Sequence, residues 1–323
     1  MKNILITGAN GYLGAQISAH LADAGHAVTA VCYPAIPDDA VWCAKMKQVL
    51  CGSVASDAFR AELADQSYDA LIHLVSLDHH ASQNASTTQA LDVNVHPTWD
   101  LLDRFSKKGL KTFVFFSTIH VYGGQAEGLI QESQAVRPGN VYALTHALSE
   151  TICSYYNDTT DVRCIQLRLS NSYGPPVFTE NNCWWLAVND LCRTAYQSRQ
   201  IRLLSDGSPR RDFIHGSDVC RAVACLLDAS DAIDVRQPFH IASGKSIRLL
   251  DLAYLIREVM NERYDEEIPI VCAPTSAGTT AIKQVEWDVS RMQALGFNVE
   301  TDLKTGIHRM FDYFETHPIH ANL

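Results

Sequence analysis

Three glycines at three-residue spacing follow the first apolar segment and constrain the fold more than any other feature of the sequence. Gly8, Gly11 and Gly14 lie in TGANGYLG, between the apolar run 3–7 and a segment, 15–24, with helical apolar spacing. Glycine suits such a strand–turn–helix unit because it permits a tight turn, close approach of a pyrophosphate to the backbone and close helix–strand contact. The helix N-terminus would then stabilise the phosphates. The motif therefore predicts an α/β unit that binds a dinucleotide.

Short apolar runs alternate with helical patterns through the first half of the chain. The runs are 3–7, 27–32, 69–75, 112–117 and 163–170. Strands separated by helices form a parallel sheet, and runs that are apolar throughout indicate that helices cover both faces. After Gly174 the pattern changes to short strands and amphipathic helices. We therefore predict an α/β fold with a Rossmann-type doubly wound parallel sheet over 1–174 and a smaller mixed α/β substrate lobe over 175–323, with some chain crossing between them.

The composition of the 323-residue chain argues against several classes of protein. A formal net charge of −10 disfavours nucleic acid as a partner, because the phosphate backbone would be repelled. No apolar run approaches the ~20 residues needed to cross a bilayer, and the start, MKNILITG, has no signal-peptide pattern. The ten cysteines include no CxxC pair, which is typical of reduced thiols in the cytoplasm. We expect a cytoplasmic protein with no membrane partner and no metal site.

The end of the second strand usually decides which dinucleotide such a fold binds. An Asp or Glu there binds the ribose 2′-hydroxyl of NAD, whereas an Arg nearby binds the 2′-phosphate of NADP. In this chain the position is Cys32, followed by Tyr33 and Pro34, so neither group is present. The sequence therefore predicts NAD(H) or NADP(H) and does not choose between them.

An ordered set of motifs carries a family resemblance over nearly the whole chain. The motifs are TGANGYLG, LIHLVS, DVNV, FFSTIHVYGG, NVYALTH, RLSNSYGP, RRDFIHGSDV and FHIASGKS. They resemble, in order and spacing, those of the extended short-chain dehydrogenase/reductases, the NAD(P)-dependent epimerases, dehydratases and 4-ketoreductases of nucleotide sugars, such as UDP-glucose 4-epimerase. The resemblance implies a nicotinamide cofactor and a nucleotide-diphosphate sugar as substrate.

The resemblance also implies three catalytic residues. The family uses a Tyr, a Lys four residues later and an upstream Ser or Thr, and these positions match Tyr142, His146 and Thr118. The lysine charge, ~5 Å from the phenol at an effective dielectric constant of ~20, is worth roughly 3 kcal/mol and lowers a tyrosine pKa by about 2. It also binds the nicotinamide ribose hydroxyls. A histidine is mostly neutral at neutral pH, but its ring can still donate one hydrogen bond to a ribose hydroxyl.

The histidine at position 146 leaves three outcomes open. In the first, the chemistry is slower and has a shifted pH profile. In the second, His146 is kept charged by a neighbouring acid or relays a proton for Tyr142. In the third, the site is degenerate and binds cofactor and sugar without turnover. The retained Thr118 and Tyr142 favour activity.

The resemblance also implies which residues contact the cofactor and, together with the positions of strand ends, which contact the substrate. For the cofactor they are Gly8, Asn10, Gly11, Tyr12, Leu13, Gly14, Cys32, Ser53, Val54, Leu74, Ser76, Asn94, Tyr142 and His146. For the substrate they are His79, His120, Asn171, Asn182, Arg211 and Asp288. His79 and His120 either contact the sugar or are packing residues, and Asp288 has the alternative role of a helix cap.

The diphosphate of the substrate needs local positive charge in this acidic chain. Arg211 and Asn171 match diphosphate ligands of the family, and Asn182 or Asn181 is expected to begin a helix that faces the same group. Family members often carry a second Arg where this chain has Val285. We expect Lys283 or Arg248 to replace it.

Together these features predict an NAD(P)-dependent epimerase or 4-ketoreductase acting at C4 of a nucleotide-diphosphate sugar, in polysaccharide or deoxysugar synthesis. Dehydration is disfavoured, because the acid pair that family dehydratases place after the catalytic Thr is replaced by Ile119 and His120. The alternative is a non-catalytic sensor of nucleotide sugar or dinucleotide. The resemblance also implies a homodimer formed through the helix that contains Tyr142.

Overall fold

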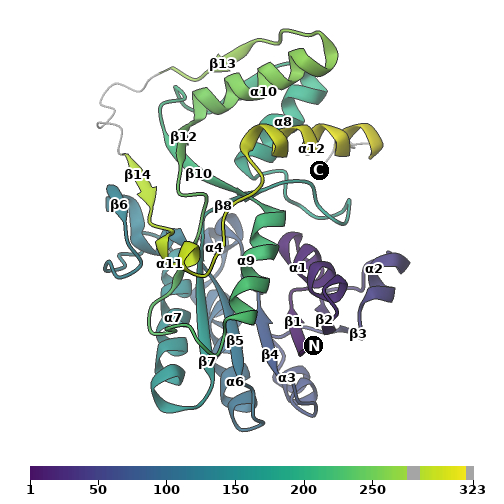
Figure 1. Cartoon of the computed structure of the whole chain (residues 1–323), viewed down its shortest axis with the longest axis vertical. Coiled ribbons are helices and arrows are strands. Elements are labelled where there is room, and N and C mark those ends of the chain that lie inside the picture. The colour runs from purple at the N-terminus through teal and green to yellow at the C-terminus, as the bar shows by residue number, and fades with distance from the viewer. Residues whose placement is uncertain (275–283, 318–323) are drawn as a thin grey trace.

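A seven-stranded parallel sheet forms the centre of the computed structural model, which describes residues 1–274 and 284–317 (Figure 1). The strand order is β11-β7-β5-β4-β1-β2-β3, and each neighbouring pair is parallel. The strands are β1 (Asn3–Thr7), β2 (Ala27–Cys32), β3 (Gln48–Cys51), β4 (Ala70–His73), β5 (Thr112–Thr118), β7 (Arg163–Leu169) and β11 (Phe239–Ile241). The predicted doubly wound α/β sheet is confirmed.

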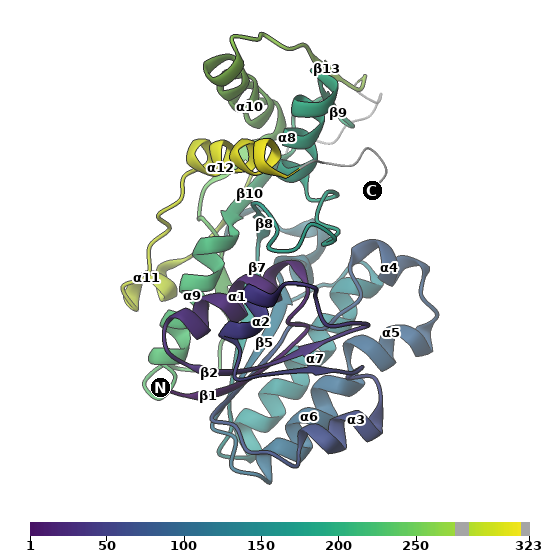
Figure 2. The same cartoon turned by 90° about the vertical axis from the view of Figure 1, so that its right-hand side faces the viewer.

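Helices cover both faces of this sheet (Figure 2). One face carries α1 (Tyr12–Asp23), α2 (Ala40–Lys45) and α9 (Gly216–Asp228). The other carries α3 (Asp57–Leu63), α5 (Thr87–Asn94), α6 (His96–Ser106) and α7 (Val141–Thr159). None of the helices in the described ranges is long and apolar enough to cross a bilayer.

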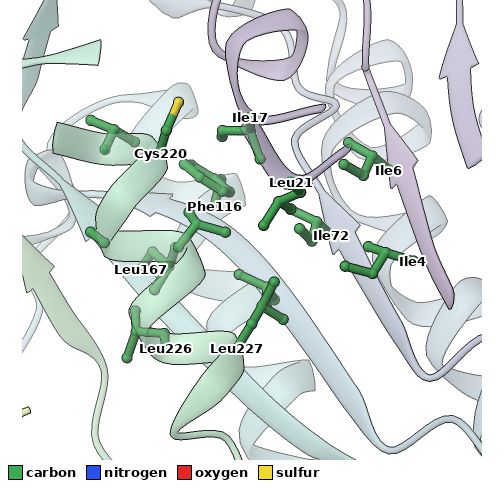
Figure 3. Close-up of a cluster of buried hydrophobic side chains, with 14 of the residues drawn as sticks. Ile4, Ile6, Ile17, Leu21, Ile72, Phe116, Leu167, Cys220, Leu226 and Leu227 are labelled. Carbon is green, nitrogen blue, oxygen red and sulfur yellow. The ribbon is translucent and has the colours of Figure 1, made fainter. Parts of the chain in front are cut away.

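The core beneath α1 and α9 shows why both faces of the strands are apolar. Side chains of α1 such as Ile17 and Leu21 meet Ile4 and Ile72 of the sheet and Leu226 of α9, all buried (Figure 3). Burial of each such side chain contributes about 1.5–3 kcal/mol. Because α9 and β11 come from the second half of the chain, the segment beyond residue 174 helps to build this sheet domain.

A smaller lobe lies at the carboxyl ends of the sheet strands (Figure 1). Its three main helices, α8 (Ala187–Ser198), α10 (Leu249–Tyr264) and α12 (Leu303–Thr316), share one hydrophobic core. Its small sheets pair β8 (Asn171–Tyr173), β10 (Arg210–His215) and β12 (Ser246–Arg248), and β9 (Ile201–Leu203) with β13 (Ile270–Cys272). The remaining elements are α4 (His79–Asn84), the 3₁₀ segment η1 (Ile119–Gln125), β6 (Gly128–Ile130), which pairs with β14 (Val285–Trp287), and α11 (Ser290–Ala294).

Candidate active site

The glycine turn between β1 and α1 is shaped to let an anionic group approach the backbone. A Cβ on Gly14 would lie 2.0 Å from the carbonyl oxygen of Gly8, so only glycine fits there, and Gly8 itself adopts a φ of +75°. Gly11 caps α1 without a side-chain hydrogen bond, which leaves first-turn N–H groups of the helix available. These features fit the pyrophosphate of a dinucleotide.

The loop after β2 is tied to this turn through Asn10. Its Nδ2 donates to the carbonyl oxygen of Tyr33 (2.9 Å), and its Oδ1 accepts from the Tyr33 N–H (3.2 Å). Cys32 is fully buried, and burial raises the pKa of its thiol to about 12, so it presents neither charge nor surface to a ribose. The cavity beside the loop is lined by Asp38 and Glu180, and no Lys or Arg lines it within the described residues.

Other predicted cofactor residues lie around the carboxyl ends of β1, β3 and β4. Tyr12, Leu13 and Ser76 line the same groove as Tyr142, and Gly8 approaches Leu74 at the end of β4. Further residues of that set are Ser53, Val54 and Asn94, of which Val54 and Asn94 are buried. Their cofactor roles stay predictions.

Asn94 has both ends of its amide occupied inside the protein. Its Oδ1 accepts from the Leu77 N–H (2.7 Å), and its Nδ2 donates to Thr145 Oγ1 (2.9 Å). Asn94 therefore joins the loop after β4 to α7, next to Tyr142 and His146.

Tyr142 lies in the first turn of α7, which begins there because the side chain of Asn140 caps it and accepts from the Ala143 N–H (2.9 Å). Thr118, at the end of β5, lines the same groove as the phenol. Burial raises the pKa of Tyr142 to about 12, although the nearby Thr118 hydroxyl lowers it. At neutral pH Tyr142 is therefore a phenol and can donate a proton.

His146 is folded back against its own helix. Its ring lies 4.3 Å from the ring of Tyr142, centroid to centroid, and its Nδ1 lies 2.7 Å from the Tyr142 carbonyl oxygen, so Nδ1 carries a proton and donates. Burial lowers the pKa of His146. The expectation that the neutral ring donates to a ribose hydroxyl is wrong for this arrangement, because its one N–H is already used. Nε2 is left as an acceptor.

The acid nearest to His146 along the helix is Glu150, and it is already neutralised. Both Glu150 carboxylate oxygens accept from Arg168, at 3.0 and 2.7 Å, and one also accepts from Ser117 Oγ (2.5 Å). Glu150 raises the pKa of His146, but burial outweighs it. Of the three outcomes, a histidine kept charged by an acid is the one that this geometry does not support.

Two further histidines surround the phenol. The rings of His79, from α4, and His120, from η1, lie 6.1 and 6.2 Å from the Tyr142 ring, and both line the groove that contains Thr118. No group of three or more metal-binding side chains is present in the described part of the chain, so these histidines are not assembled as a metal site there.

The groove continues from Tyr142 into the smaller lobe. Asn171, Arg211, Asn182 and Trp185 line it, and Trp185 is 44% exposed. The expected helix at Asn181 or Asn182 is wrong, because α8 begins at Ala187. Asn181 Nδ2 instead donates to the carbonyl oxygen of Asn10 (2.8 Å) and joins the two lobes.

Two expected substrate ligands do not face this groove. Asp288 does not line the groove, and its Oδ1 accepts from the N–H of Ser290, the first residue of α11 (2.9 Å). The N-cap of α11 is Val289 and not Asp288, so the alternative that Asp288 caps this helix is wrong. Arg248 forms a two-point ion pair with Asp251 (2.7 and 2.5 Å) on the surface. Lys283 lies outside the described residues. The role of Asp288 at a ribose stays a prediction.

A buried polar network behind the site was not predicted from the sequence. Arg168 donates to Tyr122 Oη (2.5 Å), which bonds His240 Nε2 (2.6 Å), and His240 Nδ1 donates to the carbonyl oxygen of Asp288 (2.9 Å). Because Nδ1 donates, Nε2 must accept from Tyr122. The donor and acceptor of each of these hydrogen bonds are therefore fixed, from Arg168 on β7 to Asp288 after β14.

Comparison with known proteins adds a family match to this geometry. A model described as the NAD dependent epimerase/dehydratase family matches residues 4–242. The low-salt glycan biosynthesis protein Agl12 of Haloferax volcanii is 24% identical over 97% of this chain and 98% of its own length. A dTDP-glucose 4,6-dehydratase of Streptomyces niveus is 27% identical over 64% of this chain and 61% of its own length.

Solved structures share the fold. A UDP-glucose 4-epimerase of Thermotoga maritima, solved with UDP-glucose, has a TM-score of 0.83 at 21% identity and covers 97% of this chain and 99% of its own. The likeness extends over both lobes, so the smaller lobe belongs to the shared architecture.

Proposed function

Because the chain belongs to the NAD-dependent epimerase/dehydratase family, we propose that it catalyses redox chemistry at C4 of a nucleotide-diphosphate sugar, as an epimerase or a 4-ketoreductase. The observation that carries this proposal is that Tyr142 and Thr118 line one groove, which also reaches the glycine turn through Tyr12 and Leu13. A proton donor and a dinucleotide site on one groove are what such a reaction needs.

Each residue of the site has a separate role in the proposed reaction. A bound NAD would supply the hydride acceptor and donor. Thr118 holds the oxygen on C4 of the sugar, and Tyr142 Oη exchanges the proton on that oxygen. Because the pKa of Tyr142 is raised to about 12, the phenol that can donate a proton predominates at neutral pH, whereas the phenolate that can remove a proton is scarce. The turn at Gly8 and Gly14 accepts the pyrophosphate.

Dehydration is a further reaction of the family, and a named 4,6-dehydratase is among the relatives of this chain. The two residues after Thr118 are Ile119, which is buried, and His120, so no carboxyl group follows the catalytic Thr. We therefore place C4 epimerisation or ketone reduction ahead of dehydration.

The second candidate function is a weakened or non-catalytic binding protein. The observation in its favour is His146, which burial holds neutral beside a phenol of raised pKa. Such a protein would bind dinucleotide and nucleotide sugar and show no turnover.

We further propose a homodimer that pairs through α7 and α6. Leu144, Leu148 and Tyr155 lie along α7 and are 47%, 41% and 58% exposed, and Trp99 of α6 is 54% exposed. Apolar side chains at this spacing form a stripe that a second copy would cover. Light scattering should give a dimer for the native chain and a monomer for Leu148→Glu; a native monomer contradicts the proposal. A role in polysaccharide or deoxysugar synthesis stays a prediction.

The dinucleotide content of the purified protein tests the proposed function. Tightly retained NAD favours an epimerase, which must hold its cofactor through two hydride transfers. Protein that is empty but binds added dinucleotide, and reduces a 4-keto nucleotide sugar with it, favours a reductase. Protein that binds dinucleotide but turns over no nucleotide sugar supports the second candidate.

A further inference from the structure

Two arginines without partners face the same stretch of the groove. Arg211, on β10, and Arg202, on β9, both line the section beyond Asn171, and both are exposed. Within the described residues neither guanidinium makes an ion pair or a hydrogen bond. Most other arginines of the described chain are engaged, as Arg248 is with Asp251 and Arg168 with Glu150.

The position of Arg202 on its strand fixes where its side chain points. Ile201 and Leu203, its neighbours on β9, are buried in the core of the smaller lobe, so the residue between them faces the opposite way, into the groove. The chain carries a net charge of −10. Asp190 lines the same stretch, but its carboxylate is already paired with Arg193 (2.8 Å). The two unpaired arginines therefore reverse the overall charge locally, which favours an anionic ligand.

The order of residues along the groove indicates which part of the ligand meets these cations. With the sugar at Tyr142, the next groups outward are His120 and Asn171, then Arg211 and Arg202. A diphosphate follows the sugar in a nucleotide-diphosphate sugar. It carries at least two negative charges, and one guanidinium leaves part of that charge unmatched.

We propose that Arg202, together with Arg211, binds the diphosphate of the substrate, so that β9 supplies the second cation. This inference rests on the proposed function and names a binding residue for it. Leu204, on the same segment, is 92% exposed, and with Leu249 and Pro209 it offers an apolar surface beside the cations. The nucleobase lies against that surface.

Calorimetric titration of the full chain with UDP, dTDP and NAD tests the assignment. Arg202→Gln should weaken binding of the nucleoside diphosphate about 10- to 100-fold, the effect of losing a charge-assisted hydrogen bond, and leave NAD binding unchanged. Arg202→Lys keeps the charge and should recover part of the loss. Arg236→Gln, an exposed arginine that lines no part of the groove, is the matched control and should bind as the native chain does.

Two results would overturn the inference in different ways. If Arg202→Gln binds the nucleoside diphosphate within twofold of the native chain, Arg202 is not a ligand and the proposed function stands. If the native chain binds NAD but no nucleoside diphosphate or nucleotide sugar, the proposed function itself fails, and the inference fails with it.

Discussion

Replacing His146 with lysine tests how the site sets the proton affinity of Tyr142. The two rings lie 4.3 Å apart, and burial holds His146 neutral at neutral pH. A lysine ammonium about 5 Å from the phenol, at an effective dielectric constant of about 20, would stabilise the phenolate by roughly 3 kcal/mol. This lowers the pKa of Tyr142 from about 12 to about 10.

The phenolate titration of Tyr142 gives a readout that does not depend on activity. The chain contains 12 tyrosines, so the absorbance of each variant is compared with that of the same variant carrying Tyr142→Phe, which isolates one phenol. His146→Gln, polar and uncharged, is the matched control and should titrate as the native protein does.

We expect the His146→Lys phenolate to form about 2 pH units lower than in the control, and turnover at neutral pH to rise by up to about 100-fold where the phenolate limits the rate. The reasoning is refuted if the phenol titrates at the same pH in His146→Lys and His146→Gln. If the His146→Lys protein is folded and the pKa of Tyr142 is lowered but turnover falls, His146 has a separate role in the reaction.

Three other perturbations probe the turn, the buried ion pair and the histidines. Gly14→Ala should abolish NAD binding in a titration, because its Cβ would meet the Gly8 carbonyl oxygen at 2.0 Å, whereas Gly139→Ala, with open space, should bind normally. Glu150→Gln should lower the free energy of unfolding in urea by about 3–5 kcal/mol, because the buried Arg168 charge loses its partner. Asp103→Asn, which breaks an exposed ion pair with Lys107, is the control and should lower it by under about 1 kcal/mol. Acid should also destabilise the fold, because burial lowers the pKa of three histidines. As pH falls below about 6.5 the unfolded chain binds protons at these histidines while the folded chain does not, so each histidine lowers the free energy of unfolding by about 2 kcal/mol between about pH 7 and 5. Equal urea midpoints at both pH values would refute this. The three histidines are His73 (pKa about 3), His215 (about 4) and His240 (about 4).

The sequence was sufficient for the parts of the fold that repeat a local pattern. Each of the five apolar runs became a strand of the main sheet, and the glycine spacing placed the turn before α1. The two strands of the main sheet that were not predicted are β3 and β11. Gln48–Cys51 is an edge strand with little burial, and Phe239–Ile241 has only three residues, so neither leaves a clear periodic signal.

The site was harder to predict where it depends on contacts between distant segments. Tyr142, Thr118, His79 and His120 come together because strand ends of a parallel sheet meet at one edge, which the sequence indicates. The tautomer of His146 is set by a carbonyl within its own helix turn, and no residue pattern reports it. Arg202 was missed because β9 carries no motif, and only the fold shows that it lines the same groove as Arg211.

The most direct test of the account is single-turnover mixing of the NAD-loaded protein with UDP-glucose, dTDP-glucose and UDP-glucuronic acid, followed through the absorbance of the reduced nicotinamide. The account predicts that at least one sugar reduces the cofactor, or gives a C4-epimerised or 4-keto product, in the native protein, and that Tyr142→Phe loses this reaction at least 100-fold while binding NAD equally well. Equal reduction in native and Tyr142→Phe protein would contradict the role of Tyr142. Tight binding of both ligands without reduction or product would contradict the claim that this site is catalytic.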